Sequence, residues 1–378
     1  MELELSSDQQ LFVETTRRFL EAESPLTKVR ELQERGQSFE RDYWRQGAEL
    51  GWTSMLVPTE YGGGNISESG LLDAALVAEE MGRLVAPGPF LPANIVAHAL
   101  TRGGGAGTGT QQGEVLAGLL SGEVIGTWAF TEPGGAWDAS GVRLSAAAAG
   151  DEWVLEGTKT CVQEAGEADW FLVTGRTGEG LTQFLVPRSA SGVEVTPLVS
   201  LDMVRHFGEV RFAGVRVPAS MVVGPAGGAA PEVEHQLQVA LVLQNAETVG
   251  ATDAVFEFTL EYSKDRVSFG RPIGSYQALK HRLADMKMWL EACHGTATAS
   301  ARAVASGSDQ STELISVAKS YIADRCPSIV QGCVQLHGGI GVTWDADLHL
   351  YLRRVAQNAA LYGSAREHRD RIAALLDV

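Results

Sequence analysis

The periodicity of apolar residues changes twice along this chain of 378 residues, and these two changes constrain its fold most strongly. Between residues 1 and 121, apolar side chains recur at steps of three and four, which indicates helices. Residues 122–228 instead contain short alternating runs such as Trp153-Val-Leu-Glu156, which are typical of an antiparallel β domain. Helical periodicity returns over residues 229–378. The sequence therefore predicts an α+β chain with a helical domain, a β domain and a helical bundle, in that order.

The last of these domains is expected to consist of long helices. Its periodic segments predict helices at about residues 232–267, 276–306, 312–336 and 365–376. Helices of this length usually pack against one another as a bundle.

The balance of charges argues against nucleic acid as a ligand. The chain has 47 acidic against 30 basic side chains, which gives a formal net charge of −17. Nucleic-acid binding needs clustered cations, because the release of phosphate counterions drives it. Only 20% of the residues are charged and 44% are hydrophobic, which predicts that part of the surface is buried between subunits.

The cysteines predict neither a disulfide framework nor a metal site. Cys161, Cys293, Cys326 and Cys333 show no Cys-x-x-Cys spacing and have no histidines at zinc-finger distances. Reduced thiols are typical of cytoplasmic proteins. The acidic N-terminal residues lack the features of a secretion signal, and no apolar run approaches the roughly 18 residues of a membrane span. We therefore expect a cytoplasmic protein without a membrane span.

Two stretches in the C-terminal region carry side chains suited to a dinucleotide. The first places Arg266 and Phe269 where one long predicted helix ends, before the turn Gly270-Arg-Pro272. A guanidinium beside an aromatic ring and a glycine can bind a diphosphate and cover an adenine. The alternative is that Arg266 only interacts with the helix dipole and that Phe269 belongs to the core.

The second stretch is Val334-Gln-Leu-His-Gly-Gly-Ile-Gly-Val-Thr343, which follows a helical pattern. Gly338 and Gly339 let a backbone approach a ligand closely, and Gln335 offers hydrogen bonds. The alternative interpretation is a simple helix stop.

Together, in this order and within this layout of helices and strands, the two stretches closely resemble the acyl-CoA dehydrogenase family. The resemblance extends over essentially the whole chain, and it includes the Thr131-Glu-Pro-Gly134 turn and the Leu155-Glu-Gly-Thr-Lys159 strand. It implies an N-terminal helical domain (1–121), a middle antiparallel β-barrel domain (122–228) and a C-terminal four-helix bundle (229–378).

The resemblance also implies FAD as the cofactor and an acyl-CoA thioester as the substrate. In this family a carboxylate removes the proton next to the thioester, the flavin accepts hydride from the following carbon, and an electron-transfer flavoprotein takes the electrons. A neighbouring subunit lends the adenosine half of the site, so a hetero- or homotetramer completes the pocket. By the resemblance, the residues that hold the diphosphate and the adenosine are Arg266, Phe269, Gln335, Gly338 and Gly339. The further cofactor contacts that it implies are Thr131, Gln163 and Ser364.

The chain departs from the family where the catalytic base is expected. Many members have a glutamate before a Gly-Thr pair near the C-terminus, whereas here Tyr362 takes the place of the carboxylate. Tyrosine has an ordinary pKa of about 10 and is a poor base at neutral pH. Other members place the glutamate on the first long helix of the bundle, where this chain has Ala240. Glu247 lies roughly 10 Å further along that helix, which favours a pocket-lining or interface carboxylate over a displaced base.

The part of the site that contacts the flavin ring departs from the family as well. The Thr131-Glu-Pro-Gly134 turn continues as Gly135-Ala-Trp-Asp138, so Trp137 lies where the family has a small hydroxyl residue. Cys161-Val-Gln163 replaces the Trp-Ile-Thr or Trp-Ile-Ser triplet that backs the ring. Gln163 can still donate a hydrogen bond toward the flavin.

The residues that would serve a neighbour's FAD are kept, whereas those that would serve this chain's own flavin ring and base are altered. Three functional hypotheses follow from this asymmetry. In the first, the chain completes the FAD site of a catalytic partner, as in bacterial heterotetrameric members that act on steroid side chains. In the second, it is a self-sufficient homo-oligomeric dehydrogenase with a displaced base such as Glu247. In the third, it binds an acyl thioester or serves as a scaffold without redox chemistry, because a fold does not fix an activity.

The acyl group is indicated only by the residues expected to line its pocket, Gln244 and Tyr362. Gln244 lies one turn after Ala240 and is polar where a plain alkyl chain would favour an aliphatic residue. This favours a bulky or oxygenated acyl group, such as a sterol side chain.

Overall fold

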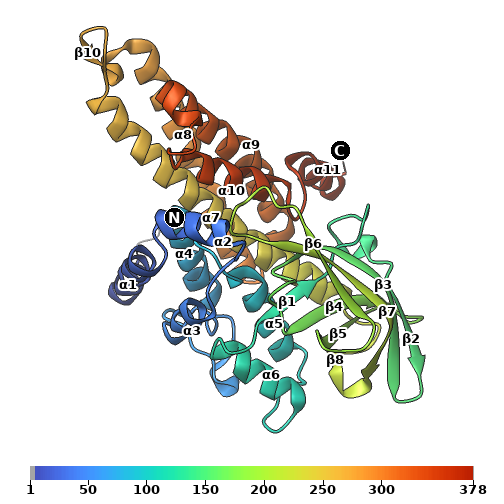
Figure 1. The fold of residues 1–378 in the computed structure, drawn as a ribbon. Helices are drawn as coiled ribbons and strands as arrows, with labels where there is room; N and C mark the ends of the chain where they lie inside the picture. Colours follow the sequence, from blue (N-terminus) through green and yellow to red (C-terminus); the bar gives the residue numbers. More distant parts are fainter. Residues whose placement is uncertain (1–4, 378) are drawn as a thin grey trace.

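The computed structural model describes residues 5–377, and over this range two helical parts flank a β sheet (Figure 1). The arrangement confirms the predicted order of helical domain, β domain and helical bundle. The N-terminal domain consists of α1 (Ser7–Glu23), α2 (Leu26–Arg35), α3 (Arg41–Glu49), α4 (Gly70–Arg83), α5 (Phe90–Arg102) and α6 (Gln111–Leu120).

The middle domain is one eight-stranded sheet, with strand order β6-β7-β3-β2-β4-β5-β8 and β1 beside β4. Its strands are β1 (Gly126–Ala129), β2 (Ser145–Ala149), β3 (Glu152–Gln163), β4 (Trp170–Arg176), β5 (Leu181–Pro187), β6 (Val193–Leu198), β7 (Phe207–Pro218) and β8 (Val222–Val223). The sheet differs from the expected antiparallel domain at β4, which pairs in parallel with β1 and with the first residue of β2. The carboxylate of Asp169 explains the first of these pairs, because it accepts the amide N–H of Ile125 at 2.8 Å and so holds the beginnings of β1 and β4 together.

The C-terminal domain extends away from the sheet, with the two-residue strands β9 (Val267–Ser268) and β10 (Arg271–Pro272) at its far end (Figure 1). Its helices are α7 (Ala230–Asp265), α8 (Gln277–Ala305), α9 (Ser311–His337), α10 (Leu348–Ala360) and α11 (Ala365–Leu375). Helix α10 was not predicted from the periodicity. None of the helices within residues 5–377 has the length and apolar character that a bilayer crossing requires.

Two hydrophobic clusters hold these parts together. The larger cluster joins the N-terminal helices, the inner face of the sheet and the beginning of α7, and the fully buried Trp44 and Trp52 belong to it. The second cluster fills the bundle, and Val29 and Leu32 of α2 reach into it. The bundle therefore packs on the N-terminal domain as well as on its own helices.

Helix α4 crosses α7 very closely, because glycines lie at the crossing on both helices. A Cβ atom on Gly82 would be 2.0 Å from the backbone oxygen of Glu247, and a Cβ atom on Gly250 would be 2.0 Å from the backbone oxygen of Glu79. These distances are far below van der Waals contact, so only glycine allows this approach. The crossing fixes α7, which carries Ala240, Gln244 and Glu247, against the N-terminal domain.

Replacement of Gly82 by alanine tests this crossing. We expect Gly82→Ala to lower the free energy of unfolding by about 1–3 kcal/mol, because the added methyl group forces two packed helices apart. Gly295, in the middle of α8, is the matched control, since a Cβ atom there would meet no atom within 4 Å. Gly295→Ala should stabilise the chain by up to about 1 kcal/mol. Urea unfolding measures both changes, and equal effects at the two positions would contradict the close crossing.

Candidate active site and cofactor contacts

Tyr362 lies in the turn between α10 and α11, and the turn holds its backbone in the left-handed region with φ of 59°. Nε2 of His368 donates a hydrogen bond of 2.9 Å to the carbonyl oxygen of Tyr362. Burial lowers the pKa of His368 to about 4, so this imidazole is neutral near pH 7. The turn and His368 therefore fix the backbone at Tyr362, the residue that the resemblance places where a base is expected.

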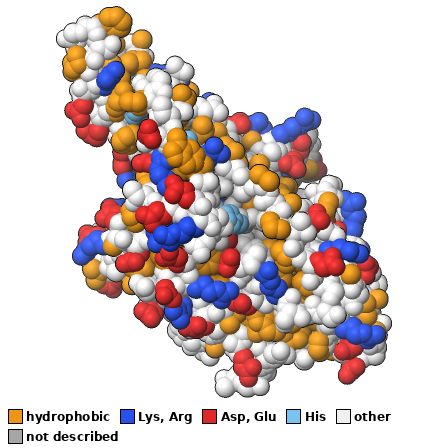
Figure 2. All heavy atoms as spheres, in the orientation of Figure 1, with side chains coloured by type: hydrophobic (Ala, Val, Ile, Leu, Met, Phe, Trp, Pro, Cys, Tyr) orange, Lys and Arg blue, Asp and Glu red, His pale blue; other side chains and the backbone are white. Residues whose placement is uncertain are grey.

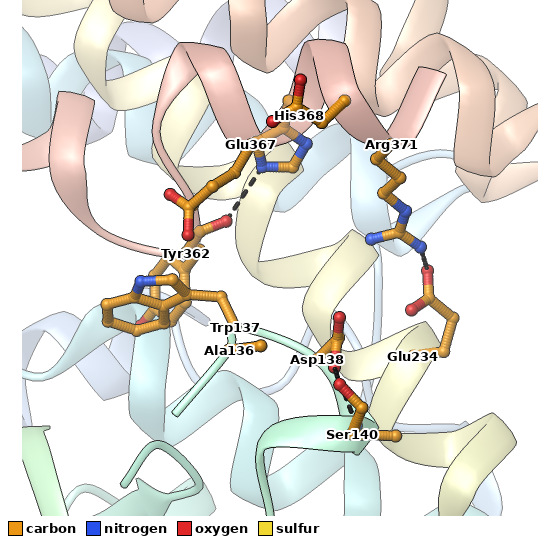
Figure 3. A pocket seen from close by; sticks show the side chains of 12 residues that line it. Ala136, Trp137, Asp138, Ser140, Glu234, Tyr362, Glu367, His368 and Arg371 are labelled. Carbon is orange, nitrogen blue, oxygen red and sulfur yellow. Dashed lines mark hydrogen bonds and ion pairs between the residues drawn. The ribbon is translucent and has the colours of Figure 1, made fainter. Parts of the chain in front are cut away.

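The ring of Tyr362 packs in an aromatic cluster with Trp128, Phe130 and Trp137. It lies edge-on to Trp137, with ring centroids 5.5 Å apart, and stacks on Trp128 at 6.1 Å. Trp128 in turn stacks on Phe130 at 4.8 Å. Figure 3 shows Trp137 lying against Tyr362. Burial raises the pKa of the Tyr362 phenol above its ordinary value, although the nearby Arg205 opposes this shift, so the phenol is an even weaker base here than in water.

A cavity of about 580 Å³ opens beside this cluster, between the β domain, α7 and α11 (Figure 3). Arg371 of α11 and Glu234 of α7 form an ion pair at its edge. The cavity is lined by the loop residues Ala136, Trp137, Asp138, Ala139 and Ser140, and by Glu234, Tyr362, Gly363, Glu367, His368, Asp370 and Arg371.

Ser364 lies next to this cavity, but its polar groups are used within its own helix. Its hydroxyl accepts the amide N–H of Glu367 at 3.3 Å, and the carboxylate of Glu367 accepts the Ser364 amide at 2.8 Å. This reciprocal cap begins α11. Ser364, which was predicted to contact the cofactor, thus caps a helix in this chain.

The turn that contains Thr131 is built around a buried ion pair between Glu132 and Lys159. Nζ of Lys159 lies 2.7 Å from Oε1 of Glu132 and 2.9 Å from the carbonyl oxygen of Phe130. Burial lowers the pKa of the wholly buried Lys159 to about 8, although the Glu132 carboxylate opposes this shift. Thr131 itself is buried, and its carbonyl oxygen accepts the amide of Thr160 at 2.8 Å. The pair holds this turn against β3.

Gln163 ends β3 with an unsatisfied amide. Its backbone oxygen accepts a hydrogen bond of 2.5 Å from the hydroxyl of Thr127. Its side-chain nitrogen Nε2 is buried and has no hydrogen-bond partner among residues 5–377. A buried donor without a partner costs free energy, and a carbonyl group of a ligand would satisfy it. Gln163 thus offers a donor that fits a flavin.

The carboxylate of Glu247 is held in a buried network of cations. It accepts bonds of 2.9 Å from Arg205 and from Arg354, and one of 2.8 Å from Asn358. Burial alone would raise the pKa of Glu247, but Arg205 and Arg354 outweigh it and lower the pKa to about 2. A carboxylate with so low a pKa and with its oxygens already bound to donors is a weak base, so this placement favours the structural interpretation of Glu247.

The amide oxygen of Gln244 also has a protein partner. Nζ of Lys319 donates to it at 2.6 Å and to the carbonyl oxygen of Asn358 at 2.5 Å. Burial lowers the pKa of Lys319 to about 7. The polarity of Gln244 is therefore explained by a buried lysine of α9, without reference to the substrate. Ala240, one turn earlier, is fully buried.

The residues predicted to serve a neighbour's cofactor lie together at the far end of the bundle. His337 stacks on Tyr262 with ring centroids 4.1 Å apart, which brings the end of α9 against the last turns of α7. Arg266 therefore lies at the same end of the bundle as Gln335. Both side chains are exposed, as are Phe269, Gly338 and Gly339.

Apolar side chains at the far end of the bundle are unusually exposed. Phe269 is 96% exposed and Val267 is 58% exposed. Figure 2 shows hydrophobic side chains at the end of the projecting bundle. Within residues 5–377, Arg266 forms no ion pair, and a Cβ atom on Gly338 or Gly339 would meet no atom within 4 Å. An unpaired guanidinium, an exposed ring and open glycine backbone fit a diphosphate and an adenosine that approach from outside this chain.

Three models of the acyl-CoA dehydrogenase family match the chain, for the N-terminal domain over residues 6–123, the middle domain over 127–215 and the C-terminal domain over 233–376. The acyl-CoA dehydrogenase IpdE2 of Mycolicibacterium smegmatis is 31% identical over 98% of this chain and 99% of that protein. The chain belongs to the acyl-CoA dehydrogenase family, whose members are FAD-dependent oxidoreductases.

Two similar solved structures are each described by a pair of component names. The ChsE4-ChsE5 complex from Mycobacterium tuberculosis contains a chain with 27% identity and a TM-score of 0.88, and the alignment covers 100% of this chain and 99% of that one. A structure described as the Tcur3481-Tcur3483 steroid ACAD matches with 27% identity and a TM-score of 0.86, over 98% of this chain and 97% of that one.

Sequence reasoning missed the charged residues that surround Glu247 and Gln244. Asp202, Arg205, Lys319, Arg354 and Asn358 are all buried, yet they come from different parts of the chain. No spacing or motif connects them. The only available signal was the low charged fraction of the chain, which does not say which charges are buried.

The role of Glu247 is tested by Glu247→Gln. Because Arg205 and Arg354 hold the pKa of Glu247 at about 2, below its ordinary value of 4.5, its contribution to stability is present above pH 4.5 and is lost as the pH falls toward 2. We expect the free energy of unfolding of the variant at pH 7 to be roughly 3–5 kcal/mol lower than that of the parent. The variant should also lose less stability than the parent on acidification. Urea unfolding between pH 3 and 7 measures this.

The matched control is Glu194→Gln, since Glu194 pairs with Arg211 at the surface with 64% of its side chain exposed. This change should alter stability by less than about 1 kcal/mol. A Glu247→Gln variant as stable as the parent, but without turnover in the assembled enzyme, would instead identify Glu247 as the base.

Proposed function

We propose that this chain is the FAD-completing subunit of a two-component acyl-CoA dehydrogenase. It lends the diphosphate and adenosine contacts to a companion chain, which carries the catalytic glutamate. One observation carries the proposal: an aromatic cluster surrounds Tyr362 at the position where the family resemblance expects a base, whereas Arg266 and Phe269 are exposed.

The side of the site that would serve this chain's own flavin argues against independent catalysis. Trp137 and Tyr362 contact one another, and the pKa of the phenol is raised. Proton removal next to a thioester needs a base that is ionised near neutral pH and held close to the substrate. Neither Tyr362 nor the cation-bound Glu247 meets both conditions.

The exposed end of the bundle supports the other half of the proposal. Gln335 supplies an amide, Gly338 and Gly339 supply open backbone, and Arg266 supplies a charge that suits a diphosphate. When bound there, FAD would accept the hydride from the acyl-CoA held by the companion chain. The residues of this chain bind and orient the far end of that cofactor. The ChsE4-ChsE5 complex, with a chain 27% identical to this one, supports an assembly of two different subunits.

The reaction is the α,β-desaturation of an acyl-CoA, with the electrons passed to an electron-transfer flavoprotein in the cytoplasm. A steroid side chain is our proposal for the acyl group. It rests on the similarity to a protein described as a steroid ACAD, because the polarity of Gln244 is accounted for by Lys319. A heterotetramer is the proposed assembly.

A self-sufficient enzyme is the second candidate, and the unpartnered amide of Gln163 favours it. In that case the flavin would accept a hydrogen bond from Gln163, and Trp137 would have to move from its place against Tyr362. The two candidates differ in whether the chain binds flavin without a partner.

Expression with and without a companion separates the two candidates. The chain is purified alone and together with an acyl-CoA dehydrogenase homologue that has the usual glutamate, and flavin absorbance and its bleaching by acyl-CoA are recorded. We expect no bound flavin in the chain alone, and both flavin and bleaching in the complex. Flavin that is bound by the chain alone and bleached by acyl-CoA would contradict our proposal.

The variant Arg266→Ala tests which residue reaches the partner's cofactor. Loss of a charge-assisted hydrogen bond costs about 1.5–3 kcal/mol, so FAD affinity of the complex should fall roughly 10- to 100-fold. Fluorescence titration of the flavin-depleted complex measures this affinity. Arg366→Ala is the control, because Arg366 is a surface arginine of α11 with 89% of its side chain exposed. Equal affinity in the parent and in Arg266→Ala would show that the bundle end does not hold the cofactor.

A further inference from the structure

Three side chains with metal-binding atoms converge where the N-terminal domain meets the bundle. Glu79 of α4, Asp253 of α7 and His294 of α8 each offer one ligand atom, and these atoms all lie within 4.8 Å of one another. Nε2 of His294 is 2.8 Å from Oδ2 of Asp253. Ligand atoms about 2.0–2.2 Å from one ion are separated by up to roughly 4.4 Å, so shifts well below an ångström bring all three into range.

The backbone holds this cluster in place. Glu79 lies at the α4–α7 crossing, where its own carbonyl oxygen faces Gly250, three residues before Asp253. Helices α4, α7 and α8 contact one another pairwise, and Figure 1 shows α4 crossing the base of the bundle. Asp253 and His294 keep only 11% and 13% of their side chains exposed. The ligands are thus anchored on three packed helices, which gives a metal site the rigidity it needs.

The donor set selects the kind of ion. One imidazole and two carboxylates suit first-row divalent ions such as Zn²⁺ and Mn²⁺, whereas Ca²⁺ and Mg²⁺ prefer oxygen ligands alone. Two carboxylates and one imidazole carry a net charge of −1 even with the imidazole protonated.

We propose that Glu79, Asp253 and His294 bind a divalent transition-metal ion that clamps the N-terminal domain to the bundle. Each of the three helices would supply one ligand to the ion. The site lies apart from the cofactor contacts at the bundle end and from Tyr362, so its role is to stabilise the fold.

Titration with Mn²⁺ tests the proposal, because this ion prefers carboxylates and imidazole over the thiols of the chain. The full chain is freed of metal with a chelator, and the loss of the electron paramagnetic resonance signal of free Mn²⁺ measures binding. We expect one site per chain and a higher unfolding temperature with the ion. His294→Gln and the milder Asp253→Asn should each weaken binding at least tenfold. Zn²⁺ should displace Mn²⁺ from the same site.

Two controls distinguish this site from others. His281→Gln replaces an exposed histidine of the same helix and should leave binding unchanged. His235→Gln disrupts a second candidate, the pair in which Nε2 of His98 lies 3.2 Å from Nε2 of His235. Absence of binding to the parent chain, or binding that is lost in His235→Gln and kept in Asp253→Asn, would overturn the proposal.

Discussion

One buried ion network connects the three domains, and the position of the candidate site depends on it. Arg354 of α10 is fully buried, binds Asp202 of the β domain, donates to Glu247 of α7 at 2.9 Å and donates to the carbonyl oxygen of Ala86 at 3.3 Å. Arg205 joins it through Glu247. Removal of one partner from such a network leaves a buried charge without compensation, which costs several kcal/mol. The network therefore fixes the β domain and α10 against α7, and the turn that carries Tyr362 follows directly from α10.

The sequence predicted the domain order and the helix end at Arg266, because both depend on local patterns. Alternation with a period of two or of 3.6 residues identifies strands and helices, and Arg266 belongs to a motif at the end of a helix. Helix α10 was missed, although its buried residues Leu348, Tyr351 and Val355 recur at steps of three and four. The partners of Glu247 and Gln244 had no such signal, since Arg354 and Lys319 are distant in sequence and differ from other charged residues only in their burial. The proposed metal ligands were missed for the same reason.

Exposure and burial divide the site into two halves with opposite physical properties. At the bundle end, Phe269 presents 96% of its surface to solvent, although a large apolar side chain is normally covered. At the other end, Tyr362 and Trp137 pack on one another and on Trp128. In this family the adenosine contact comes from a neighbouring chain in homotetramers as well as in heterotetramers, so the exposure of Phe269 fits both candidate functions. The replacement of a carboxylate by Tyr362 is what sets this chain apart from a self-sufficient enzyme.

The packing energies of the two candidate functions are of similar size, so the base decides between them. The amide of Gln163 without a partner costs roughly 1–3 kcal/mol, and a bound flavin would recover it. The aromatic pairs Trp137–Tyr362, Trp128–Tyr362 and Trp128–Phe130 each contribute about 0.5–1.5 kcal/mol beyond the area they bury. A self-sufficient enzyme in which Trp137 moved away from Tyr362 would lose about as much as it regained at Gln163. It would still need a base that is ionised near neutral pH and free to accept a proton, and neither Tyr362 nor the cation-bound Glu247 meets both conditions, which supports the proposed completing subunit.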